Sequence, residues 1–292
     1  MNQFNNIGII GRYRSQHIID TVQELVDFLV KKKCHIMLEQ ETAEHLNTQQ
    51  LKTYDKDMLA QQADLLIVVG GDGSLLGAAK TASKHNTPVL GINRGTLGFL
   101  TDVSPNDFEH SVSEVLAGRY HEEPRFLLTA DLMDKTNVIH TTTALNEVVL
   151  MPGAIPHMIE FETHINGKFV NKQRADGLII ATPTGSTAYA LSGGGPILHP
   201  SLDALVMVPM FPHKLSSRPV VIKGDSEITL IISPKTESPP KVSCDGQERI
   251  TLPEHGSLRI SKQNNKLRLL HPANYDYFET LRNKLGWEES KV

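Results

Sequence analysis

The chain has 292 residues, of which 39% are hydrophobic and 21% are charged, a composition that excludes an intrinsically disordered protein. Its 29 basic and 33 acidic residues leave a formal net charge of −4, which gives no general attraction to nucleic acids or anionic membranes. Two cysteines, Cys34 and Cys244, are too few for a disulfide framework or a cysteine-based zinc site, and they suit a reducing compartment.

No segment of the sequence has the pattern of a targeting signal or a membrane span. The first residues lack a basic stretch followed by a long apolar core, so no secretion signal is predicted. The longest apolar stretch, Ala204–Phe211, is far shorter than the roughly 20 residues of a membrane-spanning helix. We therefore expect a cytoplasmic protein with no membrane and no nucleic acid as a partner.

The first hundred residues alternate between strand patterns and helix patterns. Leu65–Val69 is an unbroken aliphatic run before two glycines, as in a parallel strand buried on both faces. This alternation predicts an α/β domain with a mostly parallel open sheet over residues 1–124. The expected strands are Ile7–Ile10, Cys34–Glu39, Leu65–Val69 and Pro88–Ile92, and the expected helices are Ile18–Val30 and Ser74–His85.

After Pro124 the pattern changes to short strands separated by turns. Asn166-Gly167 and Asp245-Gly246 are the dipeptides most typical of tight hairpins. A β-rich, β-sandwich-like domain is predicted over 125–270. Its expected strands are Phe126–Met133, Val138–Leu150, Met158–Ile165, Phe169–Ala175, Gly177–Thr182, Leu258–Ile260 and Leu267–Leu270.

The last segment, residues 271–292, contains one more helix pattern. Tyr275, Phe278, Leu281 and Leu285 lie near one face of that helix, and this stripe is typical of a side packed against a core.

Gly70-Gly71-Asp72-Gly73-Ser74 follows the Leu65–Val69 strand and opens a helix. Ligands of open α/β sheets bind at such strand ends, and helix N–H groups favour an anion. Asp72 would repel a phosphate, yet it could accept a proton from an attacking hydroxyl group. The alternative is a plain turn in which Asp72 or Ser74 caps the helix.

Two further segments are unusual, one in its polar residues and the other in its glycine content. Asn146-Glu147 lies within the apolar strand Ala144–Leu150, so at least one of the two faces a packed side or a cleft and needs a partner there. A ligand or a neighbouring loop would serve equally well. Gly91–Asp102 is rich in glycine and favours a tight loop with packed Leu97 and Phe99.

Thr182–Pro196 combines hydroxyl groups, glycines and one aromatic residue directly after a strand. Hydroxyls and backbone amides suit phosphate and ribose, and Tyr189 suits stacking on a base. Arg174 and Asp176 precede the same strand, where they could also form a plain surface salt bridge. The chain contains no G-x-x-x-x-G-K-[ST] sequence and no complete G-x-G-x-x-G fingerprint, so other means of binding phosphate are expected.

Together these segments resemble the NAD kinase family. Residues 70–73 are similar to its GGDG signature, Asn146-Glu147 to its NE/D pair, residues 182–196 to its glycine-rich segment and residues 91–102 to its G-I-N-x-G-x-L-G-F-L-T run. Pro212–Pro219 also matches, and the likeness extends from about residue 5 to 285 in the order of the family. GGDG by itself is also found in lipid kinases, and Ser74 stands where threonine is common.

The resemblance implies an enzyme that transfers a phosphoryl group from ATP to the adenosine 2′-hydroxyl of NAD, giving NADP. It implies that Asp72 is the general base or positions the hydroxyl, that Mg²⁺ accompanies ATP, and that no residue is a dedicated metal ligand. It also implies that residues 271–292 pack back on the first domain. The binding residues carried over are Gly71, Asp72, Gly73, Asn146, Glu147, His157, Arg174, Asp176, Thr187, Ala188, Tyr189, Ala190, Leu191, Ser192 and Gln247.

The sequence is also compatible with two other functions: a GGDG-type lipid kinase and a sensor that binds NAD(H) without catalysis. The resemblance further implies a homodimer or homotetramer. The apolar run Ala204–Phe211 is more hydrophobic than a solvated strand should be, so we expect it at an interface between subunits that completes the NAD site. The alternative is a buried core strand in a monomer.

Overall fold

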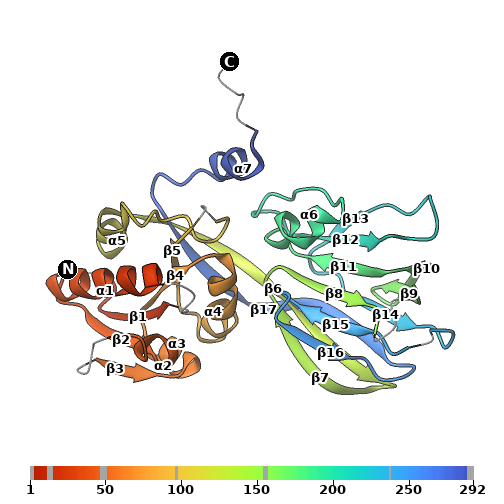
Figure 1. Ribbon diagram of the computed structural model, residues 1–292. Coiled ribbons are helices and arrows are strands. Elements are labelled where there is room, and N and C mark those ends of the chain that lie inside the picture. Colours follow the sequence, from red (N-terminus) through yellow and green to blue (C-terminus); the bar gives the residue numbers. More distant parts are fainter. Residues whose placement is uncertain are drawn as a thin grey trace. The chain divides into compact units, whose positions relative to one another are not determined.

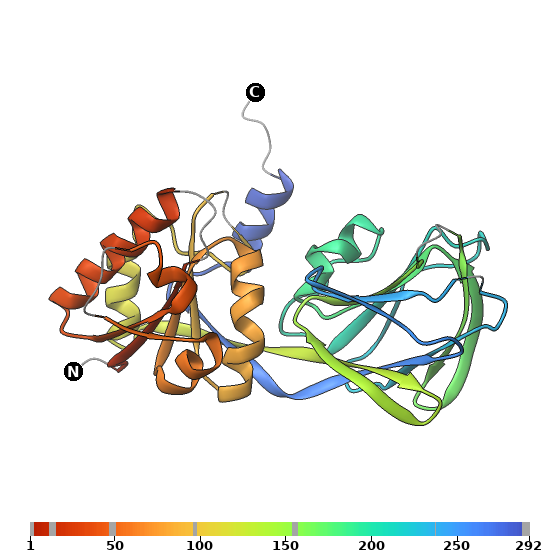
Figure 2. The same cartoon turned by 60° about the horizontal axis from the view of Figure 1, so that its bottom comes forward.

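The structure is a computed structural model, and it describes residues 3–11, 16–46, 51–95, 98–153, 157–236 and 238–287. The chain divides into two compact units, of which the first combines Met1–Pro124 with Lys266–Val292 and the second is Arg125–Asn265. Figures 1 and 2 show the elements of each unit. No helix of the described ranges is long and apolar enough to cross a membrane.

The first unit is an α/β domain with a parallel sheet of strand order β5-β4-β1-β2-β3. The last part of β17 adds to its edge, because Leu269 and Leu270 pair in parallel with Val89 and Leu90 of β5. The elements are β1 (Asn6–Gly11), α1 (Gln16–Lys31), β2 (His35–Glu39), α2 (Gln40–Ala43), β3 (Lys52–Tyr54), α3 (Lys56–Gln62), β4 (Leu65–Gly70), α4 (Asp72–His85), β5 (Val89–Asn93), α5 (Phe108–Leu116), the start of β6 (Tyr120–Asp134), the end of β17 (Ser257–Pro272) and α7 (Tyr277–Leu285).

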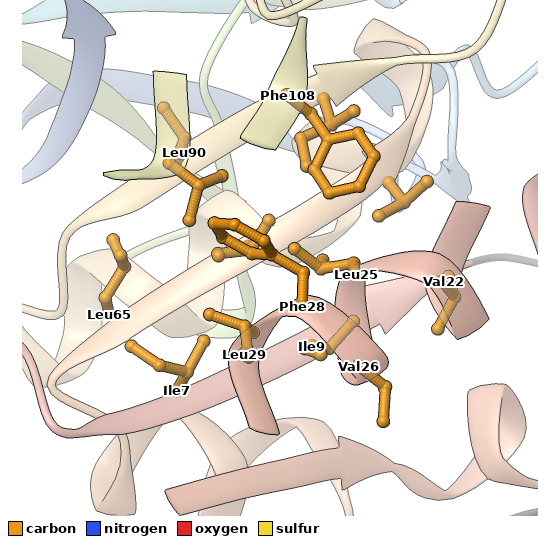
Figure 3. Packing of buried hydrophobic residues seen from close by; sticks show 14 of the residues in the cluster. Ile7, Ile9, Val22, Leu25, Val26, Phe28, Leu29, Leu65, Leu90 and Phe108 are labelled. Carbon is orange, nitrogen blue, oxygen red and sulfur yellow. The ribbon is translucent and has the colours of Figure 1, made fainter. Parts of the chain in front are cut away.

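The core of this unit forms where helix α1 lies on the sheet. Its residues Val22, Leu25 and Leu29 recur at helical spacing and are fully buried. Figure 3 shows them packed against side chains of β1 and β4, with the Phe28 ring edge-on to Phe108 at 6.0 Å. This packing holds the strands in place. Because the strands are parallel, their carboxyl ends lie at one edge of the sheet.

The second unit consists of antiparallel sheets. One has the strand order β13-β12-β11-β8-β15-β16, and the other contains β10-β9-β14-β17 with β6 and β7. One apolar cluster draws on both sheets, including Phe161 of β9 and Ile180 of β11, as in a sandwich core. The elements are β7 (Asn137–Ala144), β8 (Glu147–Met151), β9 (Ile159–Ile165), β10 (Lys168–Ala175), β11 (Gly177–Ala181), η1 (Gly185–Thr187), α6 (Tyr189–Ser192), β12 (Ala204–Met210), β13 (Val220–Lys223), β14 (Ile228–Ile232), β15 (Lys241–Cys244) and β16 (Glu248–Thr251).

Two strand predictions in the second unit were wrong in their limits. The expected strand Val138–Leu150 is two strands, β7 and β8, with Leu145 and Asn146 in the connection. The expected strands at 258–260 and 267–270 are one strand, β17, whose last residues pair with β5. The second unit ends at Asn265, within this long strand, whereas the predicted domain extended to residue 270.

Two predictions about apolar stripes also need correction. Residues Leu205–Val208 are buried between β11 and β13, so this part of the run at 204–211 is a core strand, whereas Phe211 at its end is 76% exposed. Helix α7 starts at Tyr277, after Tyr275, and of the expected stripe Leu281 is buried while the Phe278 side chain is 57% exposed. One face of this helix is thus mostly turned to solvent.

Candidate functional site

The GGDG residues lie at the carboxyl end of β4 and the beginning of α4. Helix α4 begins at Asp72 with Gly71 as its N-cap, so neither Asp72 nor Ser74 caps it as the alternative prediction had it. A Cβ atom added to Gly71 or Gly73 would meet no atom within 4 Å. The backbone is therefore accessible here, next to helix N–H groups that lack intrahelical acceptors.

The Asp72 carboxylate binds a loop that follows β5. Its Oδ2 accepts the N–H of Phe99 at 2.9 Å, and its Oδ1 accepts the N–H groups of Leu100 and Thr101 at 3.0 and 3.2 Å. The hydroxyl of Thr101 adds a fourth hydrogen bond at 3.1 Å. Asp72 thus holds residues 99–101 by accepting their hydrogen bonds. No sequence motif revealed this relationship.

Gly98 and Asn93 complete this contact. A Cβ atom on Gly98 would overlap the Asp72 carboxylate and the Thr101 hydroxyl, so only glycine fits. The buried Asn93 donates from Nδ2 to that hydroxyl at 3.0 Å. Phe99 is half-buried, and Leu97, the other residue expected to pack here, lies outside the described residues.

Asn146 and Glu147 stand at the start of β8, where a second carboxylate fixes their backbone. Asp245 accepts the N–H groups of Leu145 at 2.9 Å, Asn146 at 2.8 Å and Glu147 at 3.2 Å. Its own N–H donates back to the carbonyl of Glu147 at 3.1 Å. The sequence indicated only a hairpin turn at Asp245-Gly246, which the φ angles of 53° and 67° confirm.

The Glu147 side chain is an unusual acid, because it is 6% exposed and lies in a strand with few charges. Burial, together with the neighbouring charge of Asp245, raises the pKa of Glu147 to about 8, and the backbone N–H of Tyr189 opposes part of the rise. Its Oε2 atom is buried without a hydrogen-bond partner among the described residues. A buried polar atom of this kind is suited to a ligand hydroxyl.

The segment that follows β11 uses most of its hydroxyls to fold itself. Thr182 Oγ1 donates to the carbonyl of Leu145 at 2.6 Å, and Ser186 Oγ donates to the carbonyl of Pro183 at 2.6 Å. Thr187 Oγ1 donates to the carbonyl of Thr184 at 3.2 Å. Each of these hydroxyls thus donates to the backbone of the protein, so only its acceptor lone pairs remain for a ligand.

The same segment is tied directly to Asn146. The carbonyl of Asn146 accepts the N–H of Thr182 at 2.9 Å, and Gly185 packs so closely on Asn146 that a Cβ atom would overlap its backbone. The structure therefore brings the Asn146-Glu147 pair, Asp245 and this segment together.

Within residues 187–192 the side chains differ in access. Tyr189 is 44% exposed and Ser192 is exposed, whereas Thr187, Ala188 and Leu191 are half-buried. Ala190 is fully buried in an apolar cluster, so only its backbone can face a ligand.

Arg174 and Asp176 lie at the other end of β11 from Glu147. Glu147 pairs with Ala181, the last residue of that strand, whereas Asp176 precedes its first residue, about 17 Å away at 3.3 Å per residue. Arg174 is exposed and Asp176 half-buried, and no ion pair joins them in the described part of the chain. Arg174 instead lines a cavity of about 220 Å³ with Gln173 and residues of the loop at 212–217.

The two remaining predicted residues are both exposed. Gln247 follows Asp245-Gly246 in the β15–β16 turn, which places it near the Asn146-Glu147 pair in the sheet. His157 lies between β8 and β9. Among the described residues no group of three or more His, Cys, Asp or Glu side chains is arranged to hold a metal ion.

Family models match nearly the whole chain. Residues 7–120 match the ATP-NAD kinase N-terminal domain, and residues 145–271 match the ATP-NAD kinase C-terminal domain. Curated relatives named NAD kinase include one from Pseudomonas fluorescens (strain Pf0-1), 54% identical, and one from Pseudomonas entomophila (strain L48), 53% identical. Each alignment covers 98% of this chain and 97% of the relative.

Solved structures agree with the sequence comparison. Yeast NADH kinase complexed with NADH is similar with a TM-score of 0.89 and 26% identity, over 100% of this chain and 90% of that one. An NAD kinase from Archaeoglobus fulgidus in complex with ATP is similar with a TM-score of 0.74 and 25% identity, over 96% and 98%. With its GGDG loop, its Asn146-Glu147 pair and both family domains in order, the chain belongs to the NAD kinase family.

Proposed function

We propose that the chain transfers the γ-phosphoryl group of ATP to the adenosine 2′-hydroxyl of NAD, and that the residues described above do so in defined roles. Membership of the NAD kinase family makes it a phosphotransferase that acts on NAD with ATP. The observation that carries the residue assignment is the buried Glu147 Oε2, which has no hydrogen-bond partner among the described residues.

On the second unit, Glu147 and Asn146 recognise the dinucleotide. Glu147 hydrogen-bonds a ribose hydroxyl, and Asn146, whose side chain is half-buried, contacts the adenine. Tyr189 is exposed enough to stack on a base, while the amides of the segment at 187–192 line the bound dinucleotide. Asp245 takes part by fixing the backbone of both recognition residues.

On the first unit, Asp72 accepts the proton of the 2′-hydroxyl or positions that hydroxyl. Its carboxylate already accepts four hydrogen bonds, so its orientation is set before substrate arrives. The open backbone at Gly71 and Gly73 admits the phosphates of the donor next to the beginning of α4. Phosphoryl transfer depends mainly on such positioning and on neutralisation of charge.

Mg²⁺ enters as the MgATP substrate, and we assign no side chain to it. Mg²⁺ dehydrates reluctantly and is commonly bound through substrate phosphates with one or two carboxylates, so we place it with the nucleotide. Removal of the ion with a chelator should therefore abolish turnover without unfolding the protein.

The direct test is formation of NADP by the purified protein with NAD, ATP and Mg²⁺. NADP is detected with a dehydrogenase that reduces NADP but not NAD. Turnover that requires both substrates supports the proposal. Phosphorylation of diacylglycerol or sphingosine instead would identify a lipid kinase, and tight NAD(H) binding without turnover would identify a sensor.

We further propose a cytoplasmic homodimer or homotetramer. The thiols of Cys34 and Cys244 suit a reducing compartment. Arg174 and Asp176 stand about 17 Å along β11 from Glu147, so a second copy would bring a second set of these residues to each dinucleotide. The side chains of Phe211 and Leu215, 76% and 92% exposed, offer apolar surface for that contact.

A further inference from the structure

A buried ionic cluster lies in the first unit, outside the residues assigned above. His271, near the end of β17, is 0% exposed, and each of its ring nitrogens faces a carboxylate. Nδ1 lies 2.8 Å from Oδ2 of Asp102, and Nε2 lies 3.3 Å from Oε2 of Glu123. The carboxylate side chains are only 7% and 12% exposed.

The surroundings favour a positive charge on this ring. A positive charge on the ring would attract both carboxylates, and that attraction is strong because all three groups lie away from water. The Tyr275 ring stacks on His271 at a centroid distance of 3.9 Å and an interplanar angle of 10°. His121, another titratable group, lies on β6 with its ring centroid 6.4 Å from that of His271.

This cluster is joined to Asp72 through one residue. Asp102 directly follows Thr101, which is fully buried and donates both its N–H and its hydroxyl to Asp72. On the other side, the backbone of Val103 is hydrogen-bonded to Gly91 and Asn93 of β5. The loop of residues 98–103 is thus held by Asp72, by β5 and by His271.

We propose that His271 is a positioning residue for phosphoryl transfer, and that as an imidazolium between Asp102 and Glu123 it holds the loop at 98–102 in the conformation that binds Asp72. The inference rests on the proposed role of Asp72. His271 touches neither substrate; it acts through Asp102 and Thr101. Loss of the ring charge loosens the loop amides and leaves the Asp72 carboxylate free to turn.

The first test measures the loop itself by amide hydrogen exchange of the full-length protein. In His271→Gln the amides of Phe99, Leu100 and Thr101 should exchange at least about tenfold faster, while those of helix α1 keep their rates. His110→Gln is the matched control, since His110 is exposed on α5, and it should change nothing. Unchanged exchange at 99–101, or a uniform rise throughout the unit, would overturn the proposal.

The second test reads the charge on the ring of the unmodified protein. Nitrogen-15 spectra should show both ring nitrogens of His271 protonated at neutral pH, and a neutral ring would contradict the proposal. Asp102→Asn, which keeps the size of the side chain, should make the ring neutral and speed exchange at 99–101. This variant also serves if His271→Gln does not fold.

The third test is kinetic and depends on the assigned reaction. In His271→Gln, kcat should fall about tenfold while the KM values for NAD and ATP stay within about twofold, because the change affects the reacting geometry and not binding. A rise in either KM with kcat unchanged would refute a positioning role. If the unmodified protein made no NADP, the proposed function would fail, yet exchange and spectra would still decide whether His271 holds the loop.

Discussion

Asp72 and Thr101 are joined by two hydrogen bonds, one from the Thr101 N–H at 3.2 Å and one from its hydroxyl at 3.1 Å. Both end on the same carboxylate oxygen, Oδ1, so a group proposed to accept a proton is also the anchor of a loop. The two roles can be separated, because a change at Thr101 removes a donor and leaves the carboxylate in place.

Asp72→Asn should lower kcat by about 10²–10⁴, the usual contribution of general acid–base catalysis, with a much smaller effect on NAD binding. Steady-state rates of NADP formation and equilibrium NAD binding are the measurements. Thr101→Val, which keeps the carboxylate and removes one donor, should cost only a few-fold. Equal losses in the two variants would mean that Asp72 serves the loop and not the proton.

Gly98→Ala should lower kcat at least about tenfold and destabilise the protein by about 1–3 kcal/mol, because the added methyl group overlaps the Asp72 carboxylate. Gly77→Ala is the matched control. Gly77 lies within helix α4 with no atom within 4 Å of an added Cβ, so this change should stabilise the helix by about 0.5–1 kcal/mol. Urea denaturation and kcat together check both; a fully active Gly98→Ala enzyme would count against a fixed loop.

Glu147→Ala should raise the KM for NAD strongly and leave the KM for ATP nearly constant, because a buried group that pairs with a substrate hydroxyl leaves a large penalty when it is removed. Glu254→Ala, at a side chain that is 83% exposed, should have no effect. Equal damage to the use of both substrates, or loss of folding, would assign Glu147 a structural role.

The raised pKa of Glu147 predicts how stability depends on pH. With a pKa of about 8 in the folded chain against an ordinary 4.5, the folded protein keeps a proton that the unfolded chain releases. Between those two values the free energy of unfolding should therefore decrease as pH rises, by on the order of 1 kcal/mol per pH unit.

Glu147→Gln removes this titration, so its stability relative to the unmodified protein should improve as the pH is raised through that range and level off above about pH 8. Urea denaturation of both proteins across the range is the measurement. Parallel pH profiles would show that Glu147 is already ionised in the folded protein.

The homo-oligomer stays a prediction that sedimentation velocity checks directly. If a second copy completes the NAD site, mixing Glu147→Ala subunits with Asp176→Ala subunits should give a higher rate at low NAD concentration than either variant alone, because mixed assemblies contain sites with neither change. Phe211→Ser and Leu215→Ser should weaken association. A monomer whose specific activity stays constant on dilution would contradict this arrangement.

Local pattern was sufficient for β1, β2, β4, β5, α1 and α4 of the parallel half, but it missed β3, α2, α3 and α5. The aliphatic run of β4 and the helical spacing of Val22, Leu25 and Leu29 have one good interpretation each. The sequence predicts two strands in place of β17 because the residues between its apolar ends are polar. A polar stretch in the sequence does not distinguish a loop between two strands from an exposed part of one strand.

The partners of the charged groups were not predictable in this way. Asp245 lies about a hundred positions from the amides that it binds, and Asp72 is 27–29 positions from its own. The hydroxyls of Ser186 and Thr187 show the opposite case, since each has an acceptor three residues away, and composition does not show whether a hydroxyl is already engaged.

The order in which the strands occur along the chain has a consequence for synthesis. The first unit needs Leu269 and Leu270 to pair with β5, yet the whole second unit is translated before them. A nascent chain therefore exposes the β5 edge of a nearly complete parallel sheet while more than a hundred residues are still being added, and an unpaired edge attracts other strands. The second unit, by contrast, is continuous in sequence and can close on the ribosome before the first is finished.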